Sequence, residues 1–274
     1  MKKMNWLLIS ILAGLVFSQS LAARQLEVDS LTVPFSKPSQ PKDLQVSLIM
    51  GSIYVNGYSG QDVRIKAQAR ASKRERSQEK NGMRLIPNTS TGLVVEEDNN
   101  SMTVGTSSWA RAIDITIDVP RNTSLKLATT NNGVIEVDNI EGEIEANNSN
   151  GSIKLTRISG AAIAYSANGR VEVSFDRVTP EKTMSFITMN GTIDVTFPAN
   201  IKADVKMRTD NGNVYSDFDV EMQRNVRKVE KSDRNQGSKY RVTLDKDMYG
   251  KINGGGPEFQ FRTLNGSIYI RQKK

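Results

Sequence analysis

Residues 133–137 read Gly-Val-Ile-Glu-Val, and this five-residue pattern returns several times along the chain. The other copies are Gly-Ser-Ile-Tyr-Val at 51–55, Gly-Ser-Ile-Lys-Leu at 151–155, Gly-Arg-Val-Glu-Val at 169–173, Gly-Thr-Ile-Asp-Val at 191–195, Gly-Ser-Ile-Tyr-Ile at 266–270 and a degenerate one at 212–216. Apolar and polar residues alternate in each copy, which is typical of a β-strand with one buried face. We therefore expect one inward-facing column that contains Ile135, Ile153, Val171, Ile193 and Val214.

Asn-Gly dipeptides precede most copies of the pattern. Nine occur, several times more than random placement of the Asn and Gly residues would give. Both residue types tolerate positive φ, so Asn-Gly predicts a tight turn. The glycines from Gly133 to Gly169 follow one another at nine-residue intervals, which indicates two main strands per repeat, each ended by a glycine turn. Asparagines at equal positions of successive repeats are also expected to stack in ladders.

A repeat of 18 to 22 residues predicts the fold class. Repeats of this length are typical of solenoids, in which one repeat cannot bury its apolar face but a stack can. We predict an all-β protein, a single-stranded β-helix or β-solenoid, with basic loop insertions near 66–84 and 224–241. The alternative is a sandwich or barrel, which also uses short strands with frequent turns. Sandwich strands rarely keep one pattern at one period, which favours the solenoid.

The first 22 residues have the pattern of a signal peptide. Lys2 and Lys3 precede an apolar run over 6–17, and small residues at Ser20 and Ala22 fit a cleavage site. That run is shorter than the ~20 residues that span a bilayer. We expect cleavage after Ala22, export to the periplasm or cell surface, and no lipid anchor. Residues 23–43 then give an N-terminal strand and a proline-rich lead-in, and 44–271 give the solenoid domain.

The composition excludes most catalytic chemistry. The chain contains no Cys and no His, which removes thiolate nucleophiles, imidazole bases, disulfides and the common zinc sites. The sequence therefore predicts a protein that is not an enzyme and has no catalytic, cofactor-binding or metal-binding residues. We expect a binding or adhesion surface presented to an envelope or extracellular partner.

Positive charge is concentrated in the two insertions. Each carries seven basic and two acidic residues, so the rest of the exported chain is mildly acidic. Such clusters attract anionic glycans, lipid head groups or acidic proteins. Aromatic residues are almost absent there, which argues against sequence-specific nucleic-acid binding. The alternative is a solvated loop. The candidate anion-binding residues are Lys73, Arg74, Arg76, Arg224, Arg227, Lys228, Lys231 and Arg234.

Three other functions stay open. Glu172 and Asp194 should lie on adjacent rungs and face outward, as in β-helix enzymes that process polysaccharides, although an ordinary solvated column explains them better. A strip of tyrosines at 54, 58, 215 and 269 could bind carbohydrate or simply suit strands. The protein could instead be purely structural and self-associate through end strands near 44–55 and 266–271.

Three stretches resemble one family. They are Gly-Ser-Ile-Tyr-Val-Asn-Gly-Tyr-Ser-Gly at 51–60, the row of Asn-Gly repeats, and Gly-Gly-Gly-Pro-Glu-Phe-Gln-Phe-Arg-Thr-Leu-Asn-Gly-Ser-Ile-Tyr-Ile-Arg at 254–271. Together they resemble the DUF4097 family of bacterial adhesin-like proteins over about 44–271. The resemblance implies a β-solenoid envelope protein without established enzymatic activity, and it supplies no catalytic residues.

Overall fold

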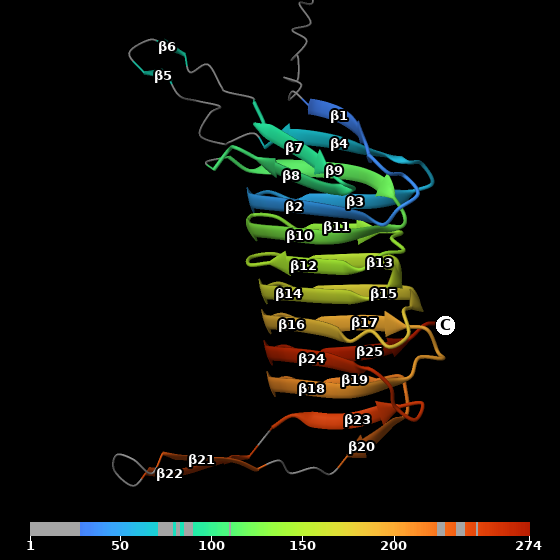
Figure 1. Cartoon of the computed structure of the whole chain (residues 1–274). Coiled ribbons are helices and arrows are strands. Elements are labelled where there is room, and N and C mark those ends of the chain that lie inside the picture. The colour runs from blue at the N-terminus through green and yellow to red at the C-terminus, as the bar shows by residue number, and fades with distance from the viewer. Residues whose placement is uncertain are drawn as a thin grey trace, which may run out of the picture.

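The computed structural model describes residues 28–70, 79–80, 83–84, 90–109, 111–223, 228–233, 239–244 and 246–274. These residues contain strands and connecting turns, and no helix among them could cross a membrane. Two long sheets face each other along the whole height of the molecule (Figure 1). The chain is therefore all-β, and its solenoid-like stack agrees with the predicted fold class.

Sheet A contains ten strands. In spatial order they are β1 (Val28–Pro34), β4 (Asp62–Ala69), β9 (Ile113–Pro120), β3 (Ile53–Tyr58), β11 (Ile135–Asp138), β13 (Ile153–Gly160), β15 (Val171–Val178), β17 (Ile193–Phe197), β25 (Ile268–Gln272) and β19 (Val214–Ser216).

Sheet B contains eleven strands. In spatial order they are β20 (Val220–Gln223), β23 (Met248–Ile252), β18 (Ala203–Asn211), β24 (Glu258–Asn265), β16 (Met184–Asn190), β14 (Ala162–Asn168), β12 (Ile144–Asn148), β10 (Thr123–Asn131), β2 (Lys42–Met50), β8 (Ser101–Thr106) and β7 (Leu93–Asp98). Two separate antiparallel pairs are β5 (Glu79–Lys80) with β6 (Met83–Arg84), and β21 (Lys228–Asp233) with β22 (Lys239–Leu244).

Each rung of the stack consists of one strand from sheet B followed by one from sheet A. Parallel pairing places Ile135 beside Ile153, Ile153 beside Val171 and Val171 beside Ile193. All four side chains are fully buried, while Val214 at the end of the column is half-buried. The predicted inward face and the predicted repeat length are both confirmed.

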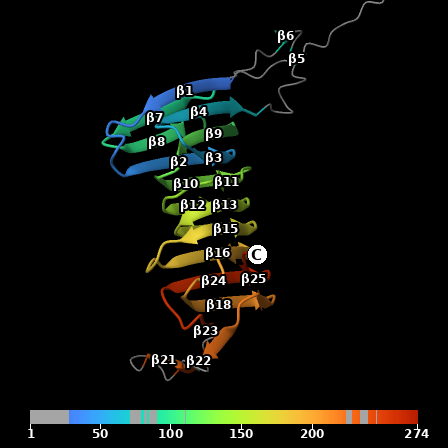
Figure 2. The same ribbon diagram turned by 90° about the vertical axis from the view of Figure 1, so that its right-hand side faces the viewer.

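The order of the rungs differs from the order of the sequence at both ends of the stack. Rung β2/β3 lies between β8/β9 and β10/β11, and the C-terminal rung β24/β25 lies between β16/β17 and β18/β19 (Figures 1 and 2). The expectation that 44–55 and 266–271 form end strands is therefore wrong. The sheets end instead at β1, β7, β19 and β20. A repeat reveals which segments share a shape, but it does not reveal which segments are neighbours.

The corner that carries the Asn-Gly sequences is built from two ladders. Six asparagine side chains form a chain of amide hydrogen bonds of 2.7–3.0 Å, in the spatial order Asn131, Asn150, Asn168, Asn190, Asn265 and Asn211. Behind it, buried Thr188 and Thr263 donate to the carbonyls of Gly169 and Gly191 on the preceding rung. The predicted asparagine ladder is confirmed.

The types of side chain that fill the core differ along the stack. Aliphatic side chains fill most of the described rungs, whereas aromatic rings gather around the inserted C-terminal rung. Phe197 stacks on Phe175 and Phe259 with ring centroids 5.2 and 5.3 Å apart, and Phe186 stacks on Phe261 at 5.4 Å. These fully buried rings join the last residues of the chain to rungs formed by much earlier segments.

Hydrogen bonds attach the N-terminal lead-in to the first end of the stack, which is the end that contains β1, β4, β7 and β8. Strand β1 pairs antiparallel with β4, so it belongs to sheet A. In the lead-in, Ser36 donates to Glu97 through its amide and hydroxyl, and the amide of Lys37 donates to Asn100 Oδ1 at 2.7 Å. Asn99 and Asn100 have positive φ and form the β7–β8 turn. Residues 96–100 thus form the end of β7 and the structural turn that follows it.

Candidate functional site

The predicted anion-binding residues lie outside the residues whose side chains the structure describes. Lys73, Arg74, Arg76, Arg224, Arg227 and Arg234 are not described, and Lys228 and Lys231 are described only as members of strand β21. Figure 1 shows the pairs β5–β6 and β21–β22 at opposite ends of the stack. The second insertion thus contains a strand pair, β21–β22, where a loop was predicted.

The first insertion is shorter than its sequence suggests. Lys66 lies in strand β4, and the backbone of Arg70 donates to the carbonyl of Ala112. Arg70 also forms an ion pair of 2.6 Å with Asp114, and this hydrogen bond raises the pKa of the guanidinium. Lys66 and Arg70 are therefore part of the scaffold and do not belong to a free basic loop.

The outward column of sheet A brings Glu172 and Asp194 side by side, as expected. Asp194 is nearly buried and accepts hydrogen bonds from Arg170 at 2.9 Å and from Arg271 at 2.7 Å. Glu172 faces Arg170 at 3.3 Å and Lys154 at 3.8 Å. The hydrogen bond and charge of Asp194 raise the pKa of Arg271. Each carboxylate is thus neutralised by a cation, an arrangement typical of a structural ion-pair network.

The tyrosine strip does not form as one surface. Tyr269 lies between Asp194 and Tyr215, and the two tyrosine rings stack with centroids 5.0 Å apart. Tyr54 belongs to β3, on the far side of β11, β13, β15 and β17. Tyr58 instead packs under the guanidinium of Arg64, at 4.6 Å. The sequence pattern could not show these separations because it does not fix the rung order.

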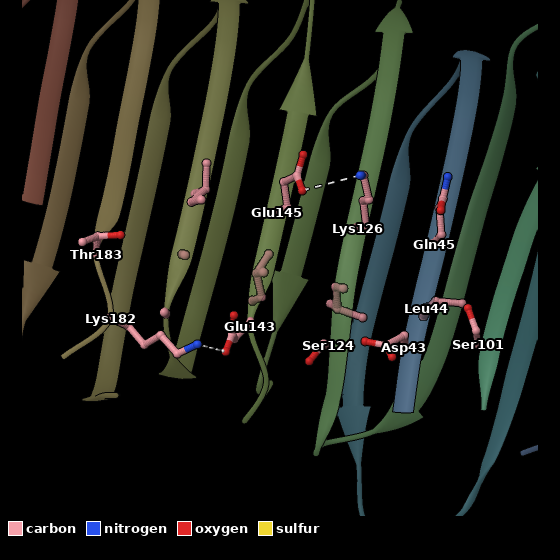
Figure 3. A pocket seen from close by; sticks show the side chains of 15 residues that line it. Asp43, Leu44, Gln45, Ser101, Ser124, Lys126, Glu143, Glu145, Lys182 and Thr183 are labelled. Atoms are coloured by element: carbon pink, nitrogen blue, oxygen red, sulfur yellow. Dashed lines mark ion pairs between the residues drawn. The ribbon is translucent and has the colours of Figure 1, made fainter. Parts of the chain in front are cut away.

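A groove of about 470 Å³ crosses the outer face of sheet B. We call it the sheet B groove; it is lined by Asp43, Leu44, Gln45, Ser101, Ser124, Leu125, Lys126, Glu143, Ile144, Glu145, Ala161, Ala162, Ile163, Lys182 and Thr183. Figure 3 shows the polar side chains on neighbouring strands, with Lys182 reaching Glu143 and Lys126 reaching Glu145. These ion pairs measure 2.9 and 3.8 Å. Three carboxylates face two ammonium groups, so the groove carries one excess negative charge.

An apolar patch adjoins this groove. It consists of Ile163, Tyr165, Ile187, Met189 and Leu264 on the adjacent strands β14, β16 and β24. The side chains of Ile163, Tyr165, Met189 and Leu264 are 39–48% exposed, and Ile187 is half-buried. Ile163 also lines the groove, which joins the two features. Contiguous exposed apolar residues with a polar border mark interaction surfaces more often than isolated ones do.

Sequence reasoning missed this surface. The alternation in 162–168 places Ile163 and Tyr165 on the outward face, where polar residues are usual, and the same holds for Ile187 and Met189. Apolar residues at outward positions of consecutive repeats were the available signal. Among the described residues, no group of three acidic side chains is placed to hold a metal ion.

The chain resembles a family model and several solved structures. The model of the Toastrack DUF4097 family matches residues 128–247. No curated protein matches the sequence. A Clostridium sporogenes structure, described as a candidate cell adhesion protein, covers 90% of this chain and 100% of its own, with a TM-score of 0.51 and 12% identity. A Bacteroides fragilis structure, described as a candidate adhesin, covers 91% and 98%, with a TM-score of 0.36 and 12% identity.

Proposed function

We propose that this chain, whose residues 128–247 match the Toastrack DUF4097 family, is an exported, non-enzymatic adhesion-like protein that binds a partner protein on the outer face of sheet B. The observation that carries the proposal is the apolar patch joined to the sheet B groove. The fold shared with the candidate Clostridium adhesion protein supports a scaffold role.

The chemistry of this face favours a protein partner. An apolar centre with a polar rim is the usual anatomy of a protein–protein interface. The patch offers aliphatic and thioether surface together with one tyrosine, whereas a glycan site would favour aromatic platforms. The excess negative charge of the groove favours basic side chains on the partner. Stacked parallel strands hold these side chains on a rigid surface, which lowers the entropic cost of binding.

The test places a photo-crosslinking residue at Tyr165 in the full chain and, in a matched control, at Glu136, which is exposed on sheet A. We expect one partner protein to crosslink at Tyr165 in cells and not at Glu136. Adding Ile163→Asn and Met189→Asn should reduce that crosslink at least tenfold. Ile49→Asn, which changes an equally exposed residue of sheet B outside the patch, should leave it unchanged.

Three outcomes contradict the proposal. The first is equal crosslinking at Tyr165 and Glu136, and the second is an unchanged crosslink after the patch is made polar. The third is retention on purified envelope glycans that falls with the same two substitutions while no protein crosslinks, which would identify the face as a glycan site.

The basic insertions are a second candidate surface. Their positive charge contrasts with the mildly acidic remainder of the chain, and pairs of strands from the two insertions lie at opposite ends of the stack (Figure 1). We propose that they add attraction toward anionic envelope components.

A further inference from the structure

The C-terminal rung fills a slot between two rungs that precede it in the sequence. Strand β24 pairs in parallel with β16 on one side and β18 on the other, and β25 does the same with β17 and β19. The chain therefore passes from β17 to β18 over an unfilled level, and residues 258–272 occupy that level last in the sequence.

These residues fit the slot in the core, at the asparagine ladder and on the outer face. Phe259, Phe261, Ile268 and Ile270 are buried inside it. Asn265 completes the asparagine ladder by bonding both Asn190 and Asn211. On the outer face, Arg271 pairs with Asp194 and Lys273 with Asp176, both at 2.7 Å. If the slot were empty, the aromatic rings beside it would be exposed and two strand edges in each sheet would be unpaired. Unpaired strand edges of this kind can accept an added strand.

The connection between β23 and the C-terminal rung is a sharp turn. Asn253, Gly254 and Gly255 have φ values of 50°, 85° and 89°, and they reverse the chain between antiparallel β23 and parallel β24. Gly256 passes so close to the next segment that a Cβ there would lie 2.5 Å from the carbonyl oxygen of Lys202. A cavity of about 620 Å³ lies at the same crossing, between this turn, residues 176–181 at the end of β15 and in the loop after it, and the loop 198–202. Asn253 donates to the carbonyls of Ala199 at 3.2 Å and Ile201 at 2.7 Å, so these are the contacts that a different course of the turn must break.

We propose that the C-terminal rung is an exchangeable element, and that the slot accepts residues 258–273 of a second copy of this chain. The donated segment would make every contact described above, because the two copies are identical and only the hinge at 253–257 must take another course. Reciprocal exchange gives a closed dimer held by two inserted rungs, which is the usual outcome when a terminal element moves on a hinge. This inference does not depend on the proposed function.

The absence of cysteine allows a direct test in the full chain. Ser185 and Gln260 are register partners on the outward faces of β16 and β24. Neighbouring strands lie about 4.8 Å apart, within the range that a disulfide bridges. Chains carrying only Ser185→Cys and chains carrying only Gln260→Cys, distinguished by a mass tag, are refolded together and oxidised. Exchange brings the two cysteines together across copies and gives a disulfide-linked heterodimer.

A matched control uses Ile163→Cys with Ser185→Cys, since these residues are register partners on β14 and β16, which belong to the continuous part of the chain. We expect at least tenfold more linked heterodimer from the Ser185–Gln260 pair than from this control pair. At low protein concentration, where exchange between copies is disfavoured, each double variant in one chain should close internally as a monomer, which shows that the geometry permits the bond. Internal closure without excess heterodimer at high protein concentration would overturn the proposal.

Discussion

At the residue scale, the repeated glycines are required by close packing between turns. A Cβ on Gly151, Gly169 or Gly191 would lie 1.9–2.2 Å from the carbonyl oxygen of the glycine one rung below. None of these three has a positive φ, whereas Gly51 and Gly266 do. Asn-Gly therefore predicts the correct positions of these turns, but positive φ is not the reason that glycine is required at Gly151, Gly169 and Gly191. Stacked turns approach so closely that only glycine fits.

Replacing Gly169 by alanine should destabilise the protein by about 1–3 kcal/mol, because its Cβ would overlap the Gly151 carbonyl oxygen at 2.2 Å and the two backbones must separate. The matched control is Gly105→Ala, where the nearest atom is 3.6 Å away and φ is not positive. Urea unfolding monitored by circular dichroism measures both variants. Equal stability of the two variants would show that the glycine stack is not a constraint.

Glu97 supplies a pH-dependent contact at the first end of the stack. Hydrogen bonds from the hydroxyl and amide of Ser36 lower its pKa, helped by the amide of Asn100. A group with a lowered folded-state pKa stabilises the fold above its ordinary pKa of about 4.3, and this contribution is lost as the pH falls through the folded-state pKa. The stability of the lead-in is therefore predicted to fall in acid.

The variant Glu97→Gln should lower the thermal midpoint at pH 7 and lose this difference progressively below about pH 4.3, as the pH falls through the lowered folded-state pKa and the parent carboxylate becomes protonated. Glu96→Gln changes an exposed neighbour on the same strand and is the control. Thermal unfolding followed from neutral to strongly acidic pH gives the comparison. A difference that persists at the lowest pH would mean that the charge of Glu97 does not matter.

At the element scale, each strand depends on its inward residues for its place in the stack. Ile153 and Val171 are fully buried register partners on β13 and β15, and both contact the neighbouring rungs above and below. Their outward neighbours Lys154 and Glu172 are half-exposed and pair at 3.8 Å, which contributes little to stability. The two faces of one strand therefore differ sharply in their tolerance to substitution.

Ile153→Asp or Val171→Asp should destabilise the domain by several kcal/mol, because each buries an unpaired carboxylate among aliphatic side chains. Lys154→Asp, one residue along on the outward face, should change the free energy of unfolding far less. Cooperative urea unfolding with an unchanged midpoint in either buried variant would show that the inward face is misassigned.

At the scale of the whole molecule, charge and apolar surface are separated. The apolar patch lies on β14, β16 and β24 in the middle part of sheet B, and the described strands of the basic insertions lie at the two ends of the stack (Figure 1). Replacing the seven basic residues of 224–241 by glutamine should weaken retention on anionic vesicles, and the loss should be greatest at low salt. Glutamine in place of Lys126 and Lys182 is the control. Retention that is unchanged, or independent of salt, would reject an electrostatic role.

The sequence by itself determined the rung and its inward face. The pattern at 133–137 and its copies fixes which side chains are buried, because a period of two allows only one face for the apolar residues. Asn-Gly positions fixed the corner and its ladder for a similar reason, since equal positions in equal repeats must stack. The composition alone excluded thiol and imidazole chemistry, because the chain contains neither cysteine nor histidine.

Only the tertiary structure decided the order of the rungs. Each copy of the repeat carries nearly the same inward residues and the same corner, so local sequence does not distinguish one neighbour from another. The placement of β24/β25 between β16/β17 and β18/β19 follows from long-range complementarity, in which the rings of Phe186 and Phe197 meet Phe261 and Phe259. Rung order also brings the outward residues of β14, β16 and β24 into one apolar patch, so the candidate site arises from packing between segments far apart in the chain.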